Sequence, residues 1–350
     1  MTVRIHWSLP LDSGQQSASG GFDAGVVDVD TMISFAREAE EAGVDSLLMP
    51  MSCYMPDPIP LLAALLRETR RVRFILAYRP GLMSPTLLTQ VINTLACMGQ
   101  SRVDLNLVAG ISPQEQAYYG DFLEHDDRYR RADEFLGIMQ ALWASREPVT
   151  FHGQHYQIEA ATLGLRHPGD GRPYIYVSGA SAPAKALAEE RADCWLCYGD
   201  LPAKVGVHAA PLLQAGKEVG LRLHVIARET REQALDAIAE MMARPDEKHR
   251  AFIKDFVSRC DSEAVKGSFR LAEQYPDHWP SPYLWTGAVP YRGGPAIAIV
   301  GSYQEVADYI REYERHGIRN FIFSGWPSRD EMRHFCGGVM PLLQKEAVHA

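Results

Sequence analysis

Strand-like and helix-like segments alternate along most of this chain of 350 residues. Short apolar runs of strand length are each followed by a segment whose apolar residues recur at helical spacing. The predicted strands lie at residues 3–10, 46–50, 72–78, 103–108, 174–178, 194–198, 222–227 and 320–324. Such alternation predicts a parallel sheet, and eight units at this length favour a closed (β/α)8 TIM barrel over an open doubly wound sheet. No G-x-G-x-x-G motif follows the first strand, which also argues against a dinucleotide-binding fold.

Two long segments interrupt the alternation, and we expect both to be insertions in a single domain that spans residues 1–350. The first insertion, at about 146–172, contains a polar stretch that predicts a hairpin at 149–159. The second, at 245–295, is rich in proline, glycine, aromatic and charged residues. We expect the second insertion to form a mobile lid over a functional site.

The composition excludes several classes of function. The formal net charge is -9 and no dense basic stretch occurs, so we expect no nucleic-acid partner. No apolar run is long enough to cross a membrane, and the first ten residues lack the pattern of a signal peptide, so we expect a cytoplasmic protein. Cys194 and Cys197 would face opposite sides of a strand, and no second ligand pair accompanies them, so we expect no metal site.

The seventh predicted strand follows a predicted helix at 204–219 and carries Arg222 and His224. Residues two apart on a strand project from the same face, while Leu223 between them projects from the other. A cation and an imidazole buried side by side cost free energy unless an anionic group meets them. The pair therefore predicts a negatively charged substrate, intermediate or cofactor group at this strand.

Polar residues also stand where other predicted strands end, and in barrels of this kind the active site lies at these ends. Cys53 follows the second strand and is either an inert thiol or a group beside a cofactor. Asn106, in the fourth strand, either ties strands together or contacts a ligand. Arg292 precedes two glycines and is either a surface arginine or a group that swings over the site. Trp326, after the last strand, either packs in the core or walls a pocket.

Two helix starts are candidate phosphate contacts. His125 and Tyr129 share one face at the start of a helix, where unpaired N–H groups favour anions. The small residues from Ser178 to Ser181 join the fifth strand to a helix that begins at Ala182, and small residues allow the backbone to approach a phosphate. The alternatives are a solvated first turn at His125 and a plain turn capped by Ser181.

Read in order, these motifs resemble the luciferase-like flavin-dependent monooxygenase family, most closely the bacterial two-component alkanesulfonate monooxygenases. The resemblance extends over nearly the whole chain, and several motifs in the same order are more specific than any one of them. The matching segments are Arg79–Pro85, Asn106–Gly110, His125–Phe135, Ser178–Glu190, Arg222–Thr230 and Arg292–Gly294.

The resemblance implies a TIM barrel that binds reduced FMN (FMNH2), supplied by a separate NAD(P)H-dependent flavin reductase. In that family O2 is the co-substrate, and a flavin peroxide converts an organosulfonate to an aldehyde and sulfite. The resemblance also implies a homodimer or a homotetramer. These properties are expectations taken from the family.

The same resemblance implies a role for each matched residue. The implied catalytic residues are Cys53, Arg222, His224 and Arg292, and a cluster of Arg222, Arg292 and protonated His224 would suit an anion. The implied cofactor contacts are Asn106, His125, Tyr129, Ser181 and Ala182. Trp326 stands where the family has tyrosine and Tyr198 where it has tryptophan. Because both positions are expected to wall the substrate pocket, this exchange leaves the substrate open.

Three other functions compete with desulfonation. A luciferase-like monooxygenase can oxidise a metabolite that carries no sulfonate. A deazaflavin-dependent oxidoreductase on the same barrel would need no oxygen, and a non-catalytic flavin-binding protein would need no catalytic residues. The set of Arg222, His224 and Arg292 argues against the last two, because an idle buried cationic cluster is costly.

Overall fold

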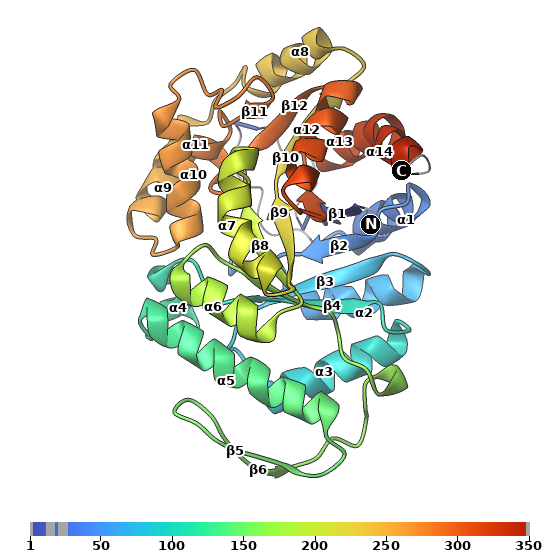
Figure 1. Cartoon of the computed structure of the whole chain (residues 1–350), viewed down its shortest axis with the longest axis vertical. Helices are drawn as coiled ribbons and strands as arrows, with labels where there is room; N and C mark the ends of the chain where they lie inside the picture. The colour runs from blue at the N-terminus through green and yellow to red at the C-terminus, as the bar shows by residue number, and fades with distance from the viewer. Residues whose placement is uncertain (1–2, 12–17, 20–26, 348–350) are drawn as a thin grey trace.

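The computed structural model describes residues 3–11, 18–19 and 27–347. Within this part of the chain, eight parallel strands close into a barrel, which confirms the predicted (β/α)8 fold (Figure 1). Around the barrel the strands run in the order β1 (Arg4–Ser8), β2 (Ser46–Met49), β3 (Arg73–Tyr78), β4 (Val103–Val108), β7 (Ile175–Ser178), β8 (Cys194–Tyr198), β9 (Glu218–Arg222) and β13 (Asn320–Phe323).

Helices lie between the strands and after the last of them. They are α1 (Val29–Glu41), α2 (Pro58–Glu68), α3 (Pro85–Met98), α4 (Pro113–Tyr118), α5 (His125–Ala144), α6 (Ala182–Arg191), α7 (Pro202–Gln214), α8 (Arg231–Met241), α12 (Tyr303–Arg315), α13 (Ser328–His334) and α14 (Met340–Ala347). Polar side chains accept backbone N–H groups at several helix starts, as Asp28 does for α1 and Ser84 for α3. The apolar faces of these helices bury one continuous core against the strands.

The seventh barrel strand differs from its prediction. The helix predicted at 204–219 ends at Gln214, and Gly216, with a φ of 76°, turns the chain where other residues would be strained. The barrel strand is therefore β9, and the segment predicted as strand seven continues as β10 (His224–Arg228). β10 leaves the barrel and pairs with β12 (Ala298–Ser302), which pairs in turn with β11 (Leu284–Trp285).

The two insertions lie in different parts of the molecule. The first forms a two-stranded antiparallel hairpin of β5 (Val149–His152) and β6 (Gln157–Ala161), at the lower end of Figure 1. The second contains α9 (Glu247–Ser258), α10 (Glu263–Gln274), β11 and α11 (Val289–Arg292), on the side of the barrel where α4 lies.

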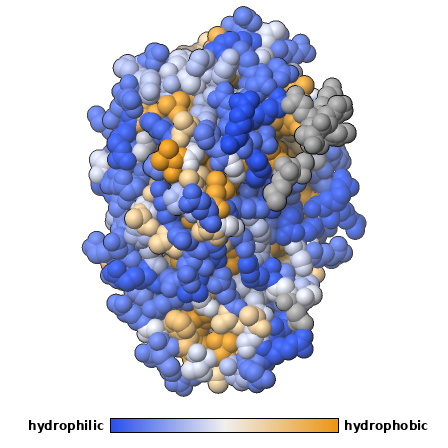
Figure 2. All heavy atoms as spheres, in the orientation of Figure 1, coloured by the Kyte–Doolittle hydropathy of each residue, from blue (hydrophilic) through white to orange (hydrophobic). Residues whose placement is uncertain are grey.

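Hydrophilic residues cover most of the face shown in Figure 2, with smaller apolar areas between them. Among the helices of the described residues, none combines the length and the apolar character that crossing a bilayer requires.

Candidate active site

A cavity of about 430 Å³ opens at the carboxyl ends of the barrel strands. Ser8, Arg79, Val108, Tyr198 and Arg222, each at or just beyond the end of a different barrel strand, line it. The second insertion covers it with apolar side chains of α9: Phe252, Ile253, Phe256 and Val257. The volume lies in the range of cofactor and substrate pockets, and the location is that of active sites in (β/α)8 barrels.

Arg222 is the last residue of β9 and lies deep in the protein, although part of its surface faces the cavity. Its Nη1 donates to Ser324 Oγ at 3.1 Å. No carboxylate of the described residues forms an ion pair with it. Burial lowers the pKa of Arg222 to about 10, which still leaves the guanidinium charged at neutral pH. The cavity wall therefore carries a positive charge for which the described residues offer no carboxylate partner.

His224, on β10, faces the same cavity and is neutral. Burial, together with the charges of Arg222 and Arg292, lowers the pKa of His224 well below 6.5. The expectation of a protonated His224 in a cationic cluster is therefore wrong, because two nearby guanidinium groups and burial disfavour a third charge. The Nδ1 atom lies 2.9 Å from the Pro295 carbonyl oxygen, which only accepts. The proton is thus on Nδ1, and Nε2 keeps a free lone pair.

Trp326 and Tyr198 also line the cavity. The Trp326 ring stacks on the His224 imidazole, with ring centroids 3.9 Å apart and an interplanar angle of 8°. This contact fixes the plane of the imidazole. Tyr198 lies near Arg222, and burial raises the pKa of its phenol.

Arg292, the last residue of α11, brings the second insertion to the same wall. It is buried, lines the cavity and lies close enough to His224 to affect its pKa. The structure thus brings Arg222, His224 and Arg292 together, although they belong to three different elements.

Asn106 and Tyr129 line another part of the cavity. Asn106 Oδ1 accepts from Ser178 Oγ at 2.8 Å. Tyr129 packs over Gly179, which has a φ of 141°; a Cβ there would lie 2.8 Å from the Tyr129 hydroxyl. Ser181 caps α6 by accepting from Ala184 N. The phenol of Tyr129, the turn at Gly179 and the start of α6 therefore form one small cradle.

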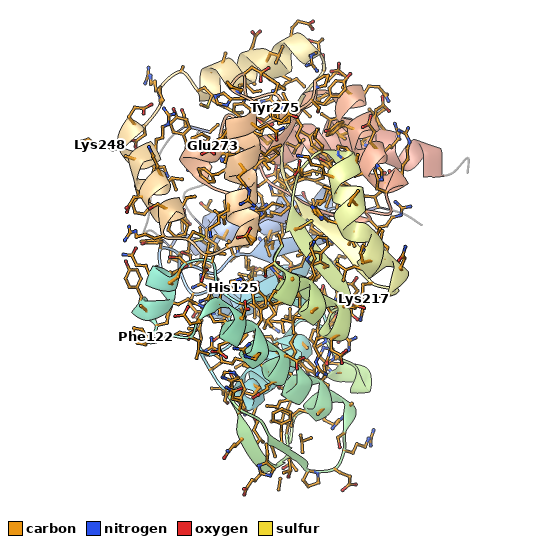
Figure 3. The ribbon with its side chains drawn as sticks, turned by 60° about the vertical axis from the view of Figure 1, so that its left-hand side comes forward. Phe122, His125, Lys217, Lys248, Glu273 and Tyr275 are labelled. Atoms are coloured by element: carbon orange, nitrogen blue, oxygen red, sulfur yellow. The ribbon has the colours of Figure 1, made fainter. Side chains whose placement is uncertain are left out.

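Three of the predicted cofactor residues lie beside the cavity instead of lining it. Ser181 and Ala182 lie at the start of α6, next to Tyr129. His125, labelled in Figure 3, is the first residue of α5; its Nδ1 lies 2.7 Å from Asp126 Oδ1 and its ring contacts Tyr129. A helix start beside a glycine turn can accept a phosphate group, and the apolar side chains of α9 can cover a ring system.

The sequence did not single out the opposite wall of the cavity, where Arg79 and Glu115 form a buried ion pair of 2.8 Å. Glu115 Oε1 also accepts from the backbone N of Cys53 at 2.9 Å. Cys53 itself does not line the cavity, but its neighbours Ser52 and Tyr54 do. Arg79 was signalled by its position at a strand end and by the family resemblance of residues 79–85, whereas Glu115 belongs to a helix of six residues and had no signal.

Among the side chains that the structure describes, no group of three His, Cys, Asp or Glu residues is arranged to hold a metal ion.

Comparisons with known proteins identify the family of this chain and structures that share its fold. Residues 3–320 match the family described as luciferase-like monooxygenase. Among solved structures, EDTA monooxygenase (EmoA) from Chelativorans sp. BNC1 is similar at 20% identity, with a TM-score of 0.80 and coverage of 100% of this chain and 95% of that chain. DmoA from Hyphomicrobium sulfonivorans has 17% identity, a TM-score of 0.81 and coverage of 99% and 89%.

The same fold also occurs with a different cofactor. An F420-dependent secondary alcohol dehydrogenase has 18% identity, a TM-score of 0.69 and coverage of 98% of this chain and 100% of that chain. At these identities the solved structures establish the fold, and the family match over most of the sequence establishes the relationship. This chain belongs to the luciferase-like monooxygenase family.

Proposed function

We propose that the protein is a two-component monooxygenase that uses reduced FMN and O2 to oxidise an organosulfonate or a related small anion. The observation that supports this most directly is Arg222, a partly buried cation that faces the cavity without a carboxylate partner among the described residues. A sulfonate would supply the missing negative charge and accept several N–H bonds from a guanidinium.

Residues in and beside the cavity would suit FMN. Its phosphate would meet the start of α6 at Ser181 and Ala182, the Gly179 turn and Tyr129, while Asn106 would contact the ring system. Reduced FMN, when bound, supplies the two electrons that activate O2. An NAD(P)H-dependent flavin reductase would deliver it. EDTA monooxygenase and DmoA share this fold.

The chain's own residues would bind, orient and shield the reactants. Arg222 would hold the anionic group, and Arg292 would approach from the lid to share its charge. His224, neutral and fixed by Pro295 and Trp326, would present Nε2 as a proton acceptor. The apolar side chains of α9 would exclude water.

Desulfonation is the specific reaction that we propose. One oxygen atom of O2 becomes the aldehyde oxygen as the carbon–sulfur bond breaks, sulfur leaves as sulfite, and the second oxygen atom becomes water. The two electrons come from reduced FMN. This balance requires a proton to leave the carbon that becomes the aldehyde. His224 Nε2 would suit the role of accepting that proton.

The test combines the protein with FMN, a flavin reductase, NADH, O2 and a panel of organosulfonates, and measures sulfite. Sulfite that depends on all components supports the proposal. An oxygenated product without sulfite would support the monooxygenase function but contradict desulfonation. Turnover only with a deazaflavin and without O2 would replace the proposal with the function of the F420-dependent neighbours. Flavin binding without any turnover would indicate a binding protein.

A further inference from the structure

An ion pair of Arg228 and Glu331 lies on the same strand as His224 but does not line the cavity, and the reaction proposed above gives it no role. Arg228 is the last residue of β10, and Glu331 belongs to α13. Arg228 donates from Nη1 to Glu331 Oε2 at 2.9 Å and from Nη2 to Oε1 at 2.6 Å. The side chain of Glu331 is 1% exposed. Two parallel charge-assisted bonds fix geometry, whereas a buried pair is weak evidence for stability.

Glu331 packs against the turn that carries Trp326. A Cβ added to Gly325 would lie 2.2 Å from Glu331 Cβ and 2.4 Å from Cγ, so the side chain of Glu331 lies directly on the backbone of this turn. Glu331 N also donates to the Pro327 carbonyl oxygen at 3.1 Å. Glu331 therefore contacts the chain on both sides of Trp326, and Arg228 ties its carboxylate to β10.

The same turn is joined to β10 around His224. Val225 N donates to the Ser324 carbonyl oxygen at 3.0 Å, and Ser324 N donates to the Leu223 carbonyl oxygen at 3.2 Å. Two residues further on, the Trp326 ring lies flat on the imidazole of His224. The seating of residues 324–326 on β10 therefore decides how the indole meets the imidazole.

We propose that Glu331, held by Arg228, is a positioning residue that seats residues 324–326 on β10 and thereby keeps the Trp326 ring stacked on His224. The consequence for catalysis rests on the function proposed above, because a fixed imidazole would present Nε2 in one direction for proton transfer. The seating itself is measured without turnover. Failure to release sulfite would therefore count against the proposed function and leave this inference standing.

The test measures the chemical shifts of the His224 ring protons by NMR, in the folded full chain with 13C-labelled histidine. Protons above the face of an indole are shifted upfield. His224→Gln assigns the signals, and Trp326→Leu gives their positions without the indole. Glu331→Ala removes both the ion pair and the packing on Gly325, so most of the upfield shift should be lost. A wild-type shift in Glu331→Ala would overturn the inference.

Two further variants separate positioning from stability. Asp104→Ala removes the carboxylate of another ion pair, formed with Arg73 near the start of β4 at the opposite end of the barrel; its side chain is 3% exposed. This variant should lose stability and keep the upfield shift. Arg228→Met combined with Glu331→Ala leaves no unpaired buried charge, so it should be more stable than Glu331→Ala and still lack the shift. If Asp104→Ala also loses the shift, or if the double variant regains it, Glu331 merely stabilises the fold and the inference is wrong.

A conservative variant keeps the test decisive if Glu331→Ala does not fold. Glu331→Gln retains the packing on Gly325 and one acceptor for Arg228, so its shift should lie between those of the wild type and Trp326→Leu. A Glu331→Gln shift equal to that of the wild type would contradict the role of the ion pair.

Discussion

Arg222 and His224 are two residues apart, yet burial affects their protons with opposite consequences. Burial lowers the pKa of both side chains. Arginine begins from 12.5 and remains charged at about 10, whereas histidine begins from 6.5 and loses its proton. One side chain therefore supplies a permanent charge, and the other supplies a lone pair.

Removing the charge of Arg222 should greatly slow turnover without weakening the binding of the flavin. For Arg222→Ala we expect kcat/KM to fall at least about 100-fold, the loss typical of a deleted group that stabilises developing charge. The dissociation constant of FMN, measured by fluorescence titration, should stay within about twofold, since the proposed phosphate contacts are elsewhere. Arg315→Ala, at an exposed position, is the control. A fully active Arg222→Ala variant would mean that the site has been misplaced.

The neutrality of His224 predicts the pH dependence of the reaction. Because its pKa in the folded protein is well below 6.5, the neutral form persists throughout pH 6–8 and is lost only as the pH falls through that lowered value. The kcat/KM of the wild type should therefore show no loss near pH 6.5 that belongs to this residue. His224→Gln should be slower but have the same profile in this range. An inflection near pH 6.5 that disappears in His224→Gln would contradict the assignment.

Much of the site could be predicted from residues at strand ends, but not the wall of Arg79 and Glu115. The spacing of Arg222 and His224 placed both on one face, and the chain stays extended through Leu223, whose N donates to Ile322 O. That spacing did not reveal that Arg222 belongs to the barrel and His224 to a second sheet. Glu115 pairs with Arg79 across 36 positions, and such a contact leaves no periodic pattern in the sequence.

At the scale of elements, one buried side chain joins the second insertion, which we propose as a lid, to the barrel. Arg128, in the first turn of α5, is 1% exposed. Its three nitrogens donate to Ala109 O at 3.0 Å, to Leu123 O at 3.0 Å and to Asp261 Oδ2 at 2.6 Å. Asp261 lies between α9 and α10. The second insertion is thus joined by an ion pair to α5, the helix that carries Tyr129.

Breaking this ion pair should loosen the lid. Asp261→Asn leaves Arg128 buried without its counter-charge, a change that typically costs about 3–5 kcal/mol. We expect faster amide hydrogen exchange in α9 and α10 than in the wild type, measured by mass spectrometry. Asp255→Asn breaks an exposed pair with Arg259 in the same segment and should have little effect. Equal exchange in both variants would show that the pair does not hold the lid.

The barrel elements could be predicted because each strand and each helix has its own spacing of apolar residues, and several helices begin at a capping residue. β1, β2, β3 and β4 lie within the predicted segments. The helix after β8 was predicted too long because its apolar spacing continues beyond Gly216, and only the backbone conformation of that glycine ends it. The helices of the second insertion were missed because prolines crowd its two ends, at 245 and 276–295, although residues 247–274 contain no proline and each helix begins after a capping side chain, Asp246 or Ser262.

At the scale of the whole molecule, stability should depend on a histidine at the end of the barrel opposite the cavity. His6 on β1 is 1% exposed, and its Nε2 lies 3.3 Å from Asn320 Oδ1. Burial lowers the pKa of His6 to about 4, although the hydrogen bond with Asn320 opposes the shift. Between pH 6.5 and 4 the unfolded chain therefore binds a proton at His6 that the folded protein does not.

The free energy of unfolding should accordingly fall as the pH drops from 6.5 towards 4, with His6 contributing up to about 3 kcal/mol of the loss. Chemical denaturation at several pH values measures it. His6→Gln should show a shallower dependence, whatever its stability at pH 7. His152→Gln, at an exposed position, should keep the slope of the wild type. The same slope in His6→Gln as in the wild type would refute the prediction.

The departure of β10 from the barrel has a consequence for how members of this fold can diversify. Arg222 is anchored in the closed ring of strands, whereas His224 is carried by the separate sheet of β10, β12 and β11. Substitutions in that outer sheet can shift the imidazole by fractions of an ångström without disturbing the ring. We therefore expect directed evolution towards new substrates to accumulate its useful changes in the outer sheet and to leave the ring almost untouched.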